Sequence, residues 1–248
     1  AVAEDWRLLE RAPAEVRGDR ALVAAVLEVS WGWALRFASA ELRADRGLVA
    51  AAVREDGLTL QYASQELRND RAVVLETVRC NGFALEYASD ALRGDAEVVI
   101  EACIQSCGAA LAWAGAALIV DRGFWQQLLG RFQPPLGRVL DRLPEELRDD
   151  RPLLLQAVRK DWRALAHASQ QLKRDRGVVR EAVRQNWESL VYAAEELQQD
   201  TEMLNASARP GQDVTSLPPG ERGPRALRYA RDAPPSLPLG ATVAAAAR

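Results

Sequence analysis

The sequence contains few of the residues on which most enzyme sites depend. His167 is the only histidine among 248 residues, and there are three cysteines. A single imidazole leaves most general acid–base schemes and most zinc sites without their usual groups. No nucleophile has a base at a recognisable spacing either. We therefore expect a protein that is not an enzyme, with no metal and no cofactor.

Long apolar runs are also missing. The longest, from Gly108 to Val120, has 13 residues, whereas a membrane-spanning helix needs about 20. Ala1 is not followed by a basic flank and an apolar stretch, so we expect no transmembrane segment and no signal peptide; earlier removal of a targeting peptide stays open. Three cysteines provide no disulfide framework, which favours a soluble protein of a reducing compartment, cytoplasmic or organellar.

Lysine is nearly absent: the sequence has only Lys160 and Lys173, whereas it has 30 arginines. Such an excess is typical of a GC-rich genome and does not by itself indicate nucleic acid. The net charge is −3, and residues from Arg209 onward carry six arginines against three acids, so the preceding residues carry −6. A phosphate-binding groove usually has the opposite sign, which disfavours nucleic acid as a partner.

What the sequence has in abundance is an internal repeat. An aspartate recurs every 25, 26 or 29 residues, and a leucine stands ten residues before each one. The aspartates are Asp19, Asp45, Asp70, Asp95, Asp121, Asp150, Asp175 and Asp200. The leucines are Leu9, Leu35, Leu60, Leu85, Leu111, Leu140, Leu165 and Leu190. This periodicity predicts eight structural units of about 25 residues.

Within each unit the pattern predicts a helix, a turn and a second helix. Tryptophan or glycine three residues before the leucine and alanine three after it share one helical face. An Asp or Asn such as Asn81 can cap this helix, and a serine or proline such as Ser39 or Pro13 ends it. The repeat aspartate then caps a second helix, whose buried face holds pairs such as Val98 and Val99.

A unit this small cannot bury its apolar face alone, so neighbouring copies must cover it. We predict an all-α fold, an α-solenoid of about eight 25-residue helix-turn-helix repeats with an extended Pro-rich C-terminal tail. Repeats one to five occupy residues 1–130, a proline-containing bend residues 131–137, repeats six to eight residues 138–208, and the Pro/Arg-rich tail residues 209–248. Pro134 and Pro135 mark the bend.

Two segments carry a resemblance to a known family: NGFALEYASDALRGDAEVV from Asn81 and DGLTLQYASQELRNDRAVV from Asp56. They closely resemble the family called domain of unknown function 4116, and the resemblance covers about residues 1–208. It implies an all-helical repeat whose module looks like two of these units in tandem. It implies no catalytic residue, and units one and five depart most from the pattern.

The residues that could carry chemistry have simpler structural interpretations. His167 occupies a slot that other units fill with Phe37, Tyr62, Tyr87, Trp113 and Tyr192, so we expect a packed ring. Cys80, Cys103 and Cys107 with His167 could be imagined as a zinc set. Because Cys103 stands in a slot that is valine elsewhere, we expect the cysteines to be buried small hydrophobic residues.

Charged residues also recur by unit. Glutamates share one slot (Glu15, Glu41, Glu66, Glu146 and Glu196). Arginines follow two residues later (Arg17, Arg43, Arg68, Arg93 and Arg148) and again after the turn (Arg20, Arg46, Arg71, Arg122, Arg151 and Arg176). Exposed ion pairs between layers are the simpler interpretation. An arginine track for an acidic partner is the alternative.

Three places are candidates for contact with partners. In unit five, Ala117 and Ile119 stand where other units have glutamate and arginine, and the apolar residues Val120, Phe124 and Trp125 follow. This apolar stretch indicates either a partner surface or burial beside the bend. Trp31 and Trp33 match no core position and form a second candidate. In the tail, Arg225, Arg228 and Tyr229 form a basic patch that could dock.

The function that these observations favour is a non-catalytic helical-repeat scaffold that binds other protein subunits. We expect a peripheral or assembly subunit of a larger complex, with an organellar complex and peripheral contact with a membrane complex left open, and no small-molecule substrate. The alternative is an RNA-binding helical repeat protein, which needs a basic concave face with base-reading side chains.

Overall fold

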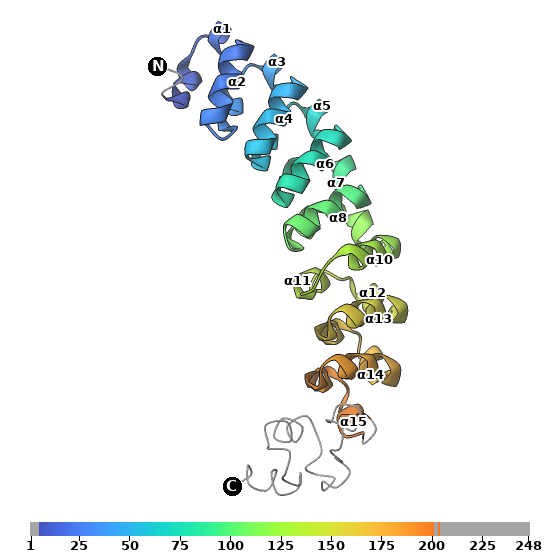
Figure 1. The fold of residues 1–248 in the computed structure, drawn as a ribbon. Coiled ribbons are helices and arrows are strands. Elements are labelled where there is room, and N and C mark those ends of the chain that lie inside the picture. The colour runs from blue at the N-terminus through green and yellow to red at the C-terminus, as the bar shows by residue number, and fades with distance from the viewer. Residues whose placement is uncertain (1–4, 201–202, 204–248) are drawn as a thin grey trace, which may run out of the picture. The chain divides into compact units, whose positions relative to one another are not determined.

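The structure is a computed structural model of the chain, and it describes residues 5–200 and residue 203. Within these residues every regular element is a helix, as predicted (Figure 1). Also within them, no helix has the length and hydropathy that crossing a membrane requires. The chain divides into two compact units, Ala1–Leu128 and Leu129–Arg248, and each is described by itself. The predicted tail, residues 209–248, lies outside the described residues.

In residues 5–200, the repeats combine three short helical elements in a fixed order, a 3₁₀-helix, a single helical turn and a ten-residue α-helix; of the eighth repeat only the first two are described. The 3₁₀-helices are η1 (Trp6–Arg11), η2 (Trp33–Phe37), η3 (Gly57–Tyr62), η4 (Gly82–Tyr87), η5 (Ala109–Trp113), η6 (Trp162–His167) and η8 (Trp187–Tyr192), and α11 (Gly137–Leu140) holds this place in the sixth repeat. The single turns are α1 (Ala14–Arg17), α3 (Ala40–Arg43), α5 (Gln65–Arg68), α7 (Asp90–Arg93), α9 (Ala116–Ile119), α12 (Glu145–Arg148), η7 (Leu172–Arg174) and α15 (Glu195–Gln198). The ten-residue helices are α2 (Arg20–Val29), α4 (Arg46–Glu55), α6 (Arg71–Cys80), α8 (Ala96–Gln105), α10 (Arg122–Arg131), α13 (Arg151–Lys160) and α14 (Arg176–Gln185).

The first helix of the unit is a 3₁₀-helix in seven of the eight repeats, whereas the sequence pattern predicted a helix without its type. A 3₁₀-helix has three residues per turn, so residues three apart lie directly above one another. Gly82, Leu85 and Ala88 follow at that spacing along η4 and its C-cap, and all three are buried. The repeated step of three is therefore the sequence signal of this geometry.

The predicted core is confirmed at every repeat leucine. Each of the eight is at most 4% exposed. The pairs near the start of the ten-residue helices, such as Val98 and Val99, are buried too, except that Leu22 is half-buried and Leu204 lies outside the described residues. In the first compact unit α2, α4, α6 and α8 follow one another side by side (Figure 1). The 3₁₀-helices contact their own neighbours in the same order. Within this unit each repeat therefore covers the apolar face of the next, which is the packing of a solenoid.

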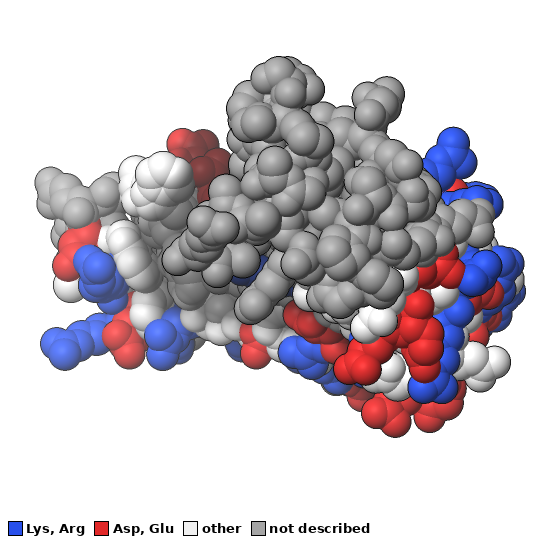
Figure 2. Space-filling model, turned by 90° about the horizontal axis from the view of Figure 1, so that it is seen from below, with Lys and Arg blue, Asp and Glu red and all other residues white. Residues whose placement is uncertain are grey.

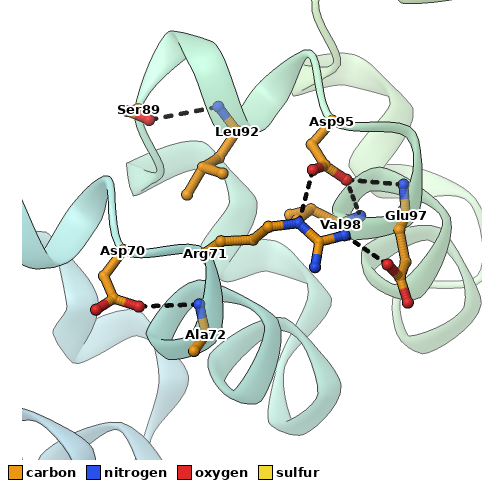
Figure 3. A network of polar contacts seen from close by, with 8 residues as sticks. All are labelled: Asp70, Arg71, Ala72, Ser89, Leu92, Asp95, Glu97 and Val98. Carbon is orange, nitrogen blue, oxygen red and sulfur yellow. Dashed lines mark hydrogen bonds and ion pairs between the residues drawn. The ribbon is translucent and has the colours of Figure 1, made fainter.

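A shared carboxylate joins consecutive repeats. Oδ1 of Asp95 accepts hydrogen bonds from the backbone N–H groups of Glu97 at 3.0 Å and Val98 at 3.1 Å, and so caps α8. Oδ2 of Asp95 accepts from Nε of Arg71, the first residue of α6, at 2.8 Å (Figure 3). This hydrogen bond lowers the pKa of the Asp95 carboxyl. The same pairing recurs between Arg20 and Asp45, Arg46 and Asp70, Arg151 and Asp175, and Arg176 and Asp200.

Two repeats are one residue longer than their neighbours, and the extra residue lies before the 3₁₀-helix. Between α2 and η2 the chain passes through Trp31 and Gly32 with φ of 55° and 81°. Cys107 and Gly108 repeat this left-handed pair before η5, with φ of 52° and 86°. A Cβ atom on Gly32 would lie 2.5 Å from the carbonyl oxygen of Ala52. The close approach of α4 and the positive φ together require glycine there.

Candidate functional site

The candidate functional surface consists of the 3₁₀-helices, which form one row in each compact unit: η1 to η5 in the first, and η6 and η8 in the second. We use the name 3₁₀ row for these helices. Ten aromatic residues lie in this row, whereas the ten-residue helices contain only Phe124 and Trp125. The ten are Trp6, Trp33, Phe37, Tyr62, Phe83, Tyr87, Trp113, Trp162, Trp187 and Tyr192. Aromatic side chains are thus concentrated in one of the two helical layers.

Aromatic rings pair between different 3₁₀-helices of the row. The four pairs have ring centroids about 6 Å apart and meet edge-to-face or tilted: Trp6 with Phe37, Trp33 with Tyr62, Phe83 with Trp113, and Trp162 with Tyr192. Such pairs stabilise a structure by roughly 0.5–1.5 kcal/mol beyond their burial. One member of each pair holds a constant place two residues after the repeat leucine. The other stands two or three residues before its leucine, so its recurrence was not visible in the sequence.

The 3₁₀ row also exposes apolar side chains. Phe83 is 46% exposed, Leu8 44%, Val191 59% and Tyr192 36%, and all four lie in 3₁₀-helices. Among the described residues the other large exposed hydrophobic side chains are Val29, Trp31 and Val120, at the ends of helices. The row therefore combines rings fixed by their neighbours with apolar groups that face solvent.

Arginine side chains cover several of the rings. The guanidinium carbon of Arg163 lies 4.5 Å from the centroid of the Trp162 ring. That of Arg7 lies 5.0 Å from the Trp6 ring, and that of Arg36 lies 5.5 Å from the Phe37 ring. Cation–π contacts at exposed sites contribute about 0.5–1 kcal/mol.

The prediction that Trp125 contacts a partner is wrong, and the other two predicted tryptophans, Trp31 and Trp33, differ in exposure. Trp125 is completely buried, and its Nε1 donates a hydrogen bond to the carbonyl oxygen of Ile119 at 2.6 Å. Its large ring belongs to the core beside Phe124, so it cannot anchor a partner at the surface. Trp31 is 69% exposed, whereas Trp33 is half-buried and donates from Nε1 to Oδ2 of Asp56 at 3.1 Å.

The remaining predicted contact residues divide between described and undescribed parts of the chain. Ile119 is half-buried, and Val120 is 64% exposed at the end of α9. Arg225, Arg228 and Tyr229 lie outside the described residues. Contact of these residues with a partner stays a prediction.

A second row, of arginine side chains that the sequence shows only as a charge pattern, borders the 3₁₀ row. Arg17, Arg43 and Arg68 end α1, α3 and α5, and the Nε atom of each is buried with no hydrogen-bond partner. Arg68 lines a hollow with Gln65, Tyr87, Ala88, Ser89 and Asp90, which come from α5, η4 and the start of α7. We call Arg17, Arg43 and Arg68 the arginine row.

His167 and the cysteines behave differently from one another. His167 is partly buried at the end of η6, with Nδ1 3.6 Å from a carboxylate oxygen of Asp141, and burial lowers its pKa. Cys103 is fully buried, which raises the pKa of its thiol to about 12. Cys80 and Cys107 are exposed, so the expectation of buried cysteines is correct only for Cys103. In residues 5–200 and 203, no His, Cys, Asp or Glu cluster could hold a metal ion.

Charges of both signs lie side by side on the face shown in Figure 2, among the described residues that are visible there. Five of the six arginines after the turns, Arg20, Arg46, Arg71, Arg151 and Arg176, pair with the repeat aspartate of the next unit. Further pairs join Arg54 to Glu76, Arg79 to Glu101, and Arg159 to Glu181 on the ten-residue helices. Much of the arginine content is therefore neutralised within the repeat array.

Comparison with known proteins identifies the repeat. The family described as domain of unknown function (DUF4116) matches five segments, residues 19–68, 45–93, 70–118, 136–173 and 154–198. The first three matches begin at Asp19, Asp45 and Asp70, each the N-cap of a ten-residue helix, and extend over two repeats. No curated protein and no solved structure matches the chain. The matches together cover more than half of the sequence, and the chain belongs to the family described as domain of unknown function 4116.

Proposed function

We propose that this protein is a non-catalytic scaffold that binds other proteins through its 3₁₀ row, as a peripheral or assembly subunit of a larger complex. The observation that carries the proposal is the exposure of apolar side chains on a row whose rings are already fixed by packing. A preformed aromatic surface loses little conformational entropy when a partner covers it. Aromatic residues and arginine are also the residue types enriched in the energetically important parts of protein interfaces.

The chemistry around the described hollow supports binding rather than catalysis. The Ser89 hydroxyl donates to Oδ1 of Asn69 at 2.6 Å and accepts from the backbone N–H of Leu92. Neither partner can serve as a general base. The nearby Asp90 carboxylate is paired with Arg93 of the same helical turn. These groups satisfy one another instead of converging on a position where a substrate atom would react.

Site-specific photocrosslinking tests the proposed surface. A photoreactive phenylalanine analogue is placed at Phe83 in the 3₁₀ row and, as a matched control, at Val29 at the end of α2, which is similarly exposed. In cells that make the protein, crosslinks to a partner protein are expected at position 83 and not at position 29. Equal crosslinking at both positions, or none at 83, contradicts the proposal.

A quantitative experiment follows with the purified crosslinked partner. We expect Phe83→Ser to weaken its binding about tenfold, the loss of roughly 1.4 kcal/mol expected for a moderate interface anchor. Val29→Ser should leave the affinity unchanged. Thermal melting of both variants controls for folding, because Phe83 also contacts the Trp113 ring.

A second function, binding of single-stranded RNA, is favoured by one observation. Arg7, Arg36 and Arg163 lie over aromatic rings, and arginine beside stacking rings is a common platform for unpaired bases. The charge of −6 over the residues before the tail opposes it. Fluorescence anisotropy with a labelled oligouridine at physiological salt distinguishes the two: submicromolar binding that Trp162→Ala abolishes favours RNA.

A further inference from the structure

Three arginines at one repeat position keep a hydrogen-bond donor inside the protein without using it. Arg17, Arg43 and Arg68 each end the single helical turn of their repeat, and their Nε atoms are buried without an acceptor. Buried polar groups are nearly always satisfied, so the same defect in three successive repeats requires an explanation. Each residue as a whole is only half-buried, and no hydrogen bond or ion pair engages its terminal amino groups within the described residues.

Arginines at the same position in other repeats have found internal partners. Arg93 pairs with Asp90 one helical turn earlier. Nε of Arg148 donates to the carbonyl oxygen of Leu143 at 3.0 Å. The fold can therefore satisfy an arginine at this position. Among the described residues, the arginine Nε atoms that are buried without a partner all lie in three consecutive repeats of the first compact unit.

The seam between repeats holds these arginines in place. The backbone N–H of Ser39 donates to the carbonyl oxygen of Arg17, and the same bond joins Ser64 to Arg43 and Ser89 to Arg68, at 2.9–3.0 Å. Each arginine backbone is therefore fixed against the start of the next short helix. The hollow beside Arg68 opens onto Tyr87, so the arginine row and the 3₁₀ row meet there. A ligand that contacts both rows therefore has to order few side chains of this protein, so little conformational entropy is lost on binding.

The distance between repeats determines which ligand fits. Packed helices lie about 8–10 Å apart. An extended peptide rises about 3.3 Å per residue, so side chains three residues apart repeat at roughly 10 Å. Carboxylates at every third position of an extended segment would thus meet successive arginines. A carboxylate accepts two N–H bonds from one guanidinium group, which is the strongest pairing open to it.

The acids between the arginines argue against a continuous polyanion. Glu41 and Glu66 are exposed on α3 and α5, and Asp90 lines the hollow with its carboxylate paired to Arg93. A ligand with negative charge at every residue, such as a nucleic acid, would meet these carboxylates as well as the arginines. A ligand with spaced carboxylates and small neutral residues between them avoids this repulsion.

We propose that the arginine row of Arg17, Arg43 and Arg68 binds an extended acidic segment of a protein partner, with carboxylates three residues apart, alongside the aromatic side chains of the 3₁₀ row. This inference rests on the proposed protein-binding function and names the chemistry of the partner. The hollow at Arg68 receives one carboxylate, and the equivalent positions at Arg43 and Arg17 receive the next two.

The test uses the full chain and two labelled peptides of one composition. One peptide consists of four Glu-Ser-Val triplets, and the other has its four glutamates contiguous. We expect the spaced peptide to bind at least about tenfold more tightly in fluorescence anisotropy at physiological salt. Equal affinity for both peptides, or no binding of either, overturns the inference.

A matched pair of variants locates the binding. Arg43→Gln with Arg68→Gln should weaken the spaced peptide at least about tenfold without lowering the melting temperature, because these arginines satisfy no internal acceptor. Arg54→Gln with Arg79→Gln removes the same charge from the ten-residue helices of the same two repeats, where both arginines are paired. An equal loss in both double variants means general charge attraction and overturns the inference.

Two outcomes separate this inference from the proposed function. If position 83 crosslinks a partner protein while the spaced peptide fails to bind, the protein-binding function stands and the acidic segment is wrong. If oligouridine displaces the spaced peptide and loses affinity in Arg43→Gln with Arg68→Gln but not in the control, the arginine row binds phosphates, and the peptide assignment is overturned.

Discussion

At the scale of single residues, two positions define the repeat. The repeat leucine is almost completely buried in all eight units. The repeat aspartate caps one helix and accepts from the arginine of the preceding repeat, so both of its oxygens are used. Asparagine could cap the helix but could not offer the second, charged acceptor.

The core leucine is tested by Leu85→Ala. Leu85 is fully buried, so loss of its side chain leaves a cavity, and the free energy of unfolding should fall by about 2–5 kcal/mol. Leu8, which is 44% exposed and one residue before a repeat leucine, is the control, and Leu8→Ala should cost less than about 1 kcal/mol. Urea denaturation measures both, and equal effects contradict the assignment of the core.

The single histidine predicts a pH dependence with a definite sign. Burial lowers the pKa of His167 below its ordinary 6.5, although the carboxylate of Asp141 opposes this shift. The unfolded chain therefore binds a proton more readily, and the stability contributed by neutral His167 is present above pH 6.5 and is lost as the pH falls toward the native pKa.

The variant His167→Phe should remove this contribution, because a phenyl ring fills the same aromatic slot without titrating. We expect the urea midpoint of the parent to fall more between pH 7 and pH 5 than that of His167→Phe. Partner binding at pH 7.5 should be the same for both proteins. Parallel pH profiles would show that the packed ring is not desolvated as the structure indicates.

At the scale of elements, the close approach of the next repeat requires glycine in η4. A Cβ atom on Gly82 would lie 2.1 Å from the carbonyl oxygen of Ala102 in α8, so the first helix must present a bare backbone there. Three residues per turn place this glycine directly below Leu85. The same turn of helix thus provides both the contact with the next repeat and the core anchor.

We expect Gly82→Ala to destabilise the protein by roughly 1–3 kcal/mol, because α8 must move away to accommodate the methyl group. Gly137 offers a matched control, since nothing lies within 4 Å of a Cβ atom there. Gly137→Ala at the start of α11 should raise stability by about 0.4–1 kcal/mol. Thermal melting distinguishes the two, and a neutral Gly82→Ala would mean that the repeats are not packed backbone to backbone.

At the scale of the whole molecule, stability is distributed over contacts between neighbouring repeats. Within each compact unit the ten-residue helices contact their successors, as α6 contacts α8 and α13 contacts α14. Backbone bonds such as that from Ser89 to Arg68 repeat the connection on the other layer. Such an array behaves approximately as a sum of local stabilities and nearest-neighbour terms.

Hydrogen exchange should show this locality directly. In Leu85→Ala, amide exchange is expected to accelerate in α6 and α8, whose repeats adjoin the cavity, and to stay at the parent's rate in α13 and α14. Mass spectrometry of peptic peptides measures both regions in one experiment. Uniform acceleration along the chain would instead indicate that both compact units unfold as one cooperative block.

The sequence by itself determined the repeat, the buried leucines and the capping aspartates, because each depends on spacing within one unit and recurs in every copy. It also indicated the family, since consecutive copies carry the same local signals. Only the tertiary structure decided which side chains reach the surface. Trp125 is buried, Phe83 is 46% exposed beside the Trp113 ring, and Arg68 has an unused donor beside Tyr87, because each of these properties depends on how the repeats pack and not on the pattern within one unit. Periodicity specifies which residues are equivalent, whereas the packing of one repeat on the next determines what each can contact.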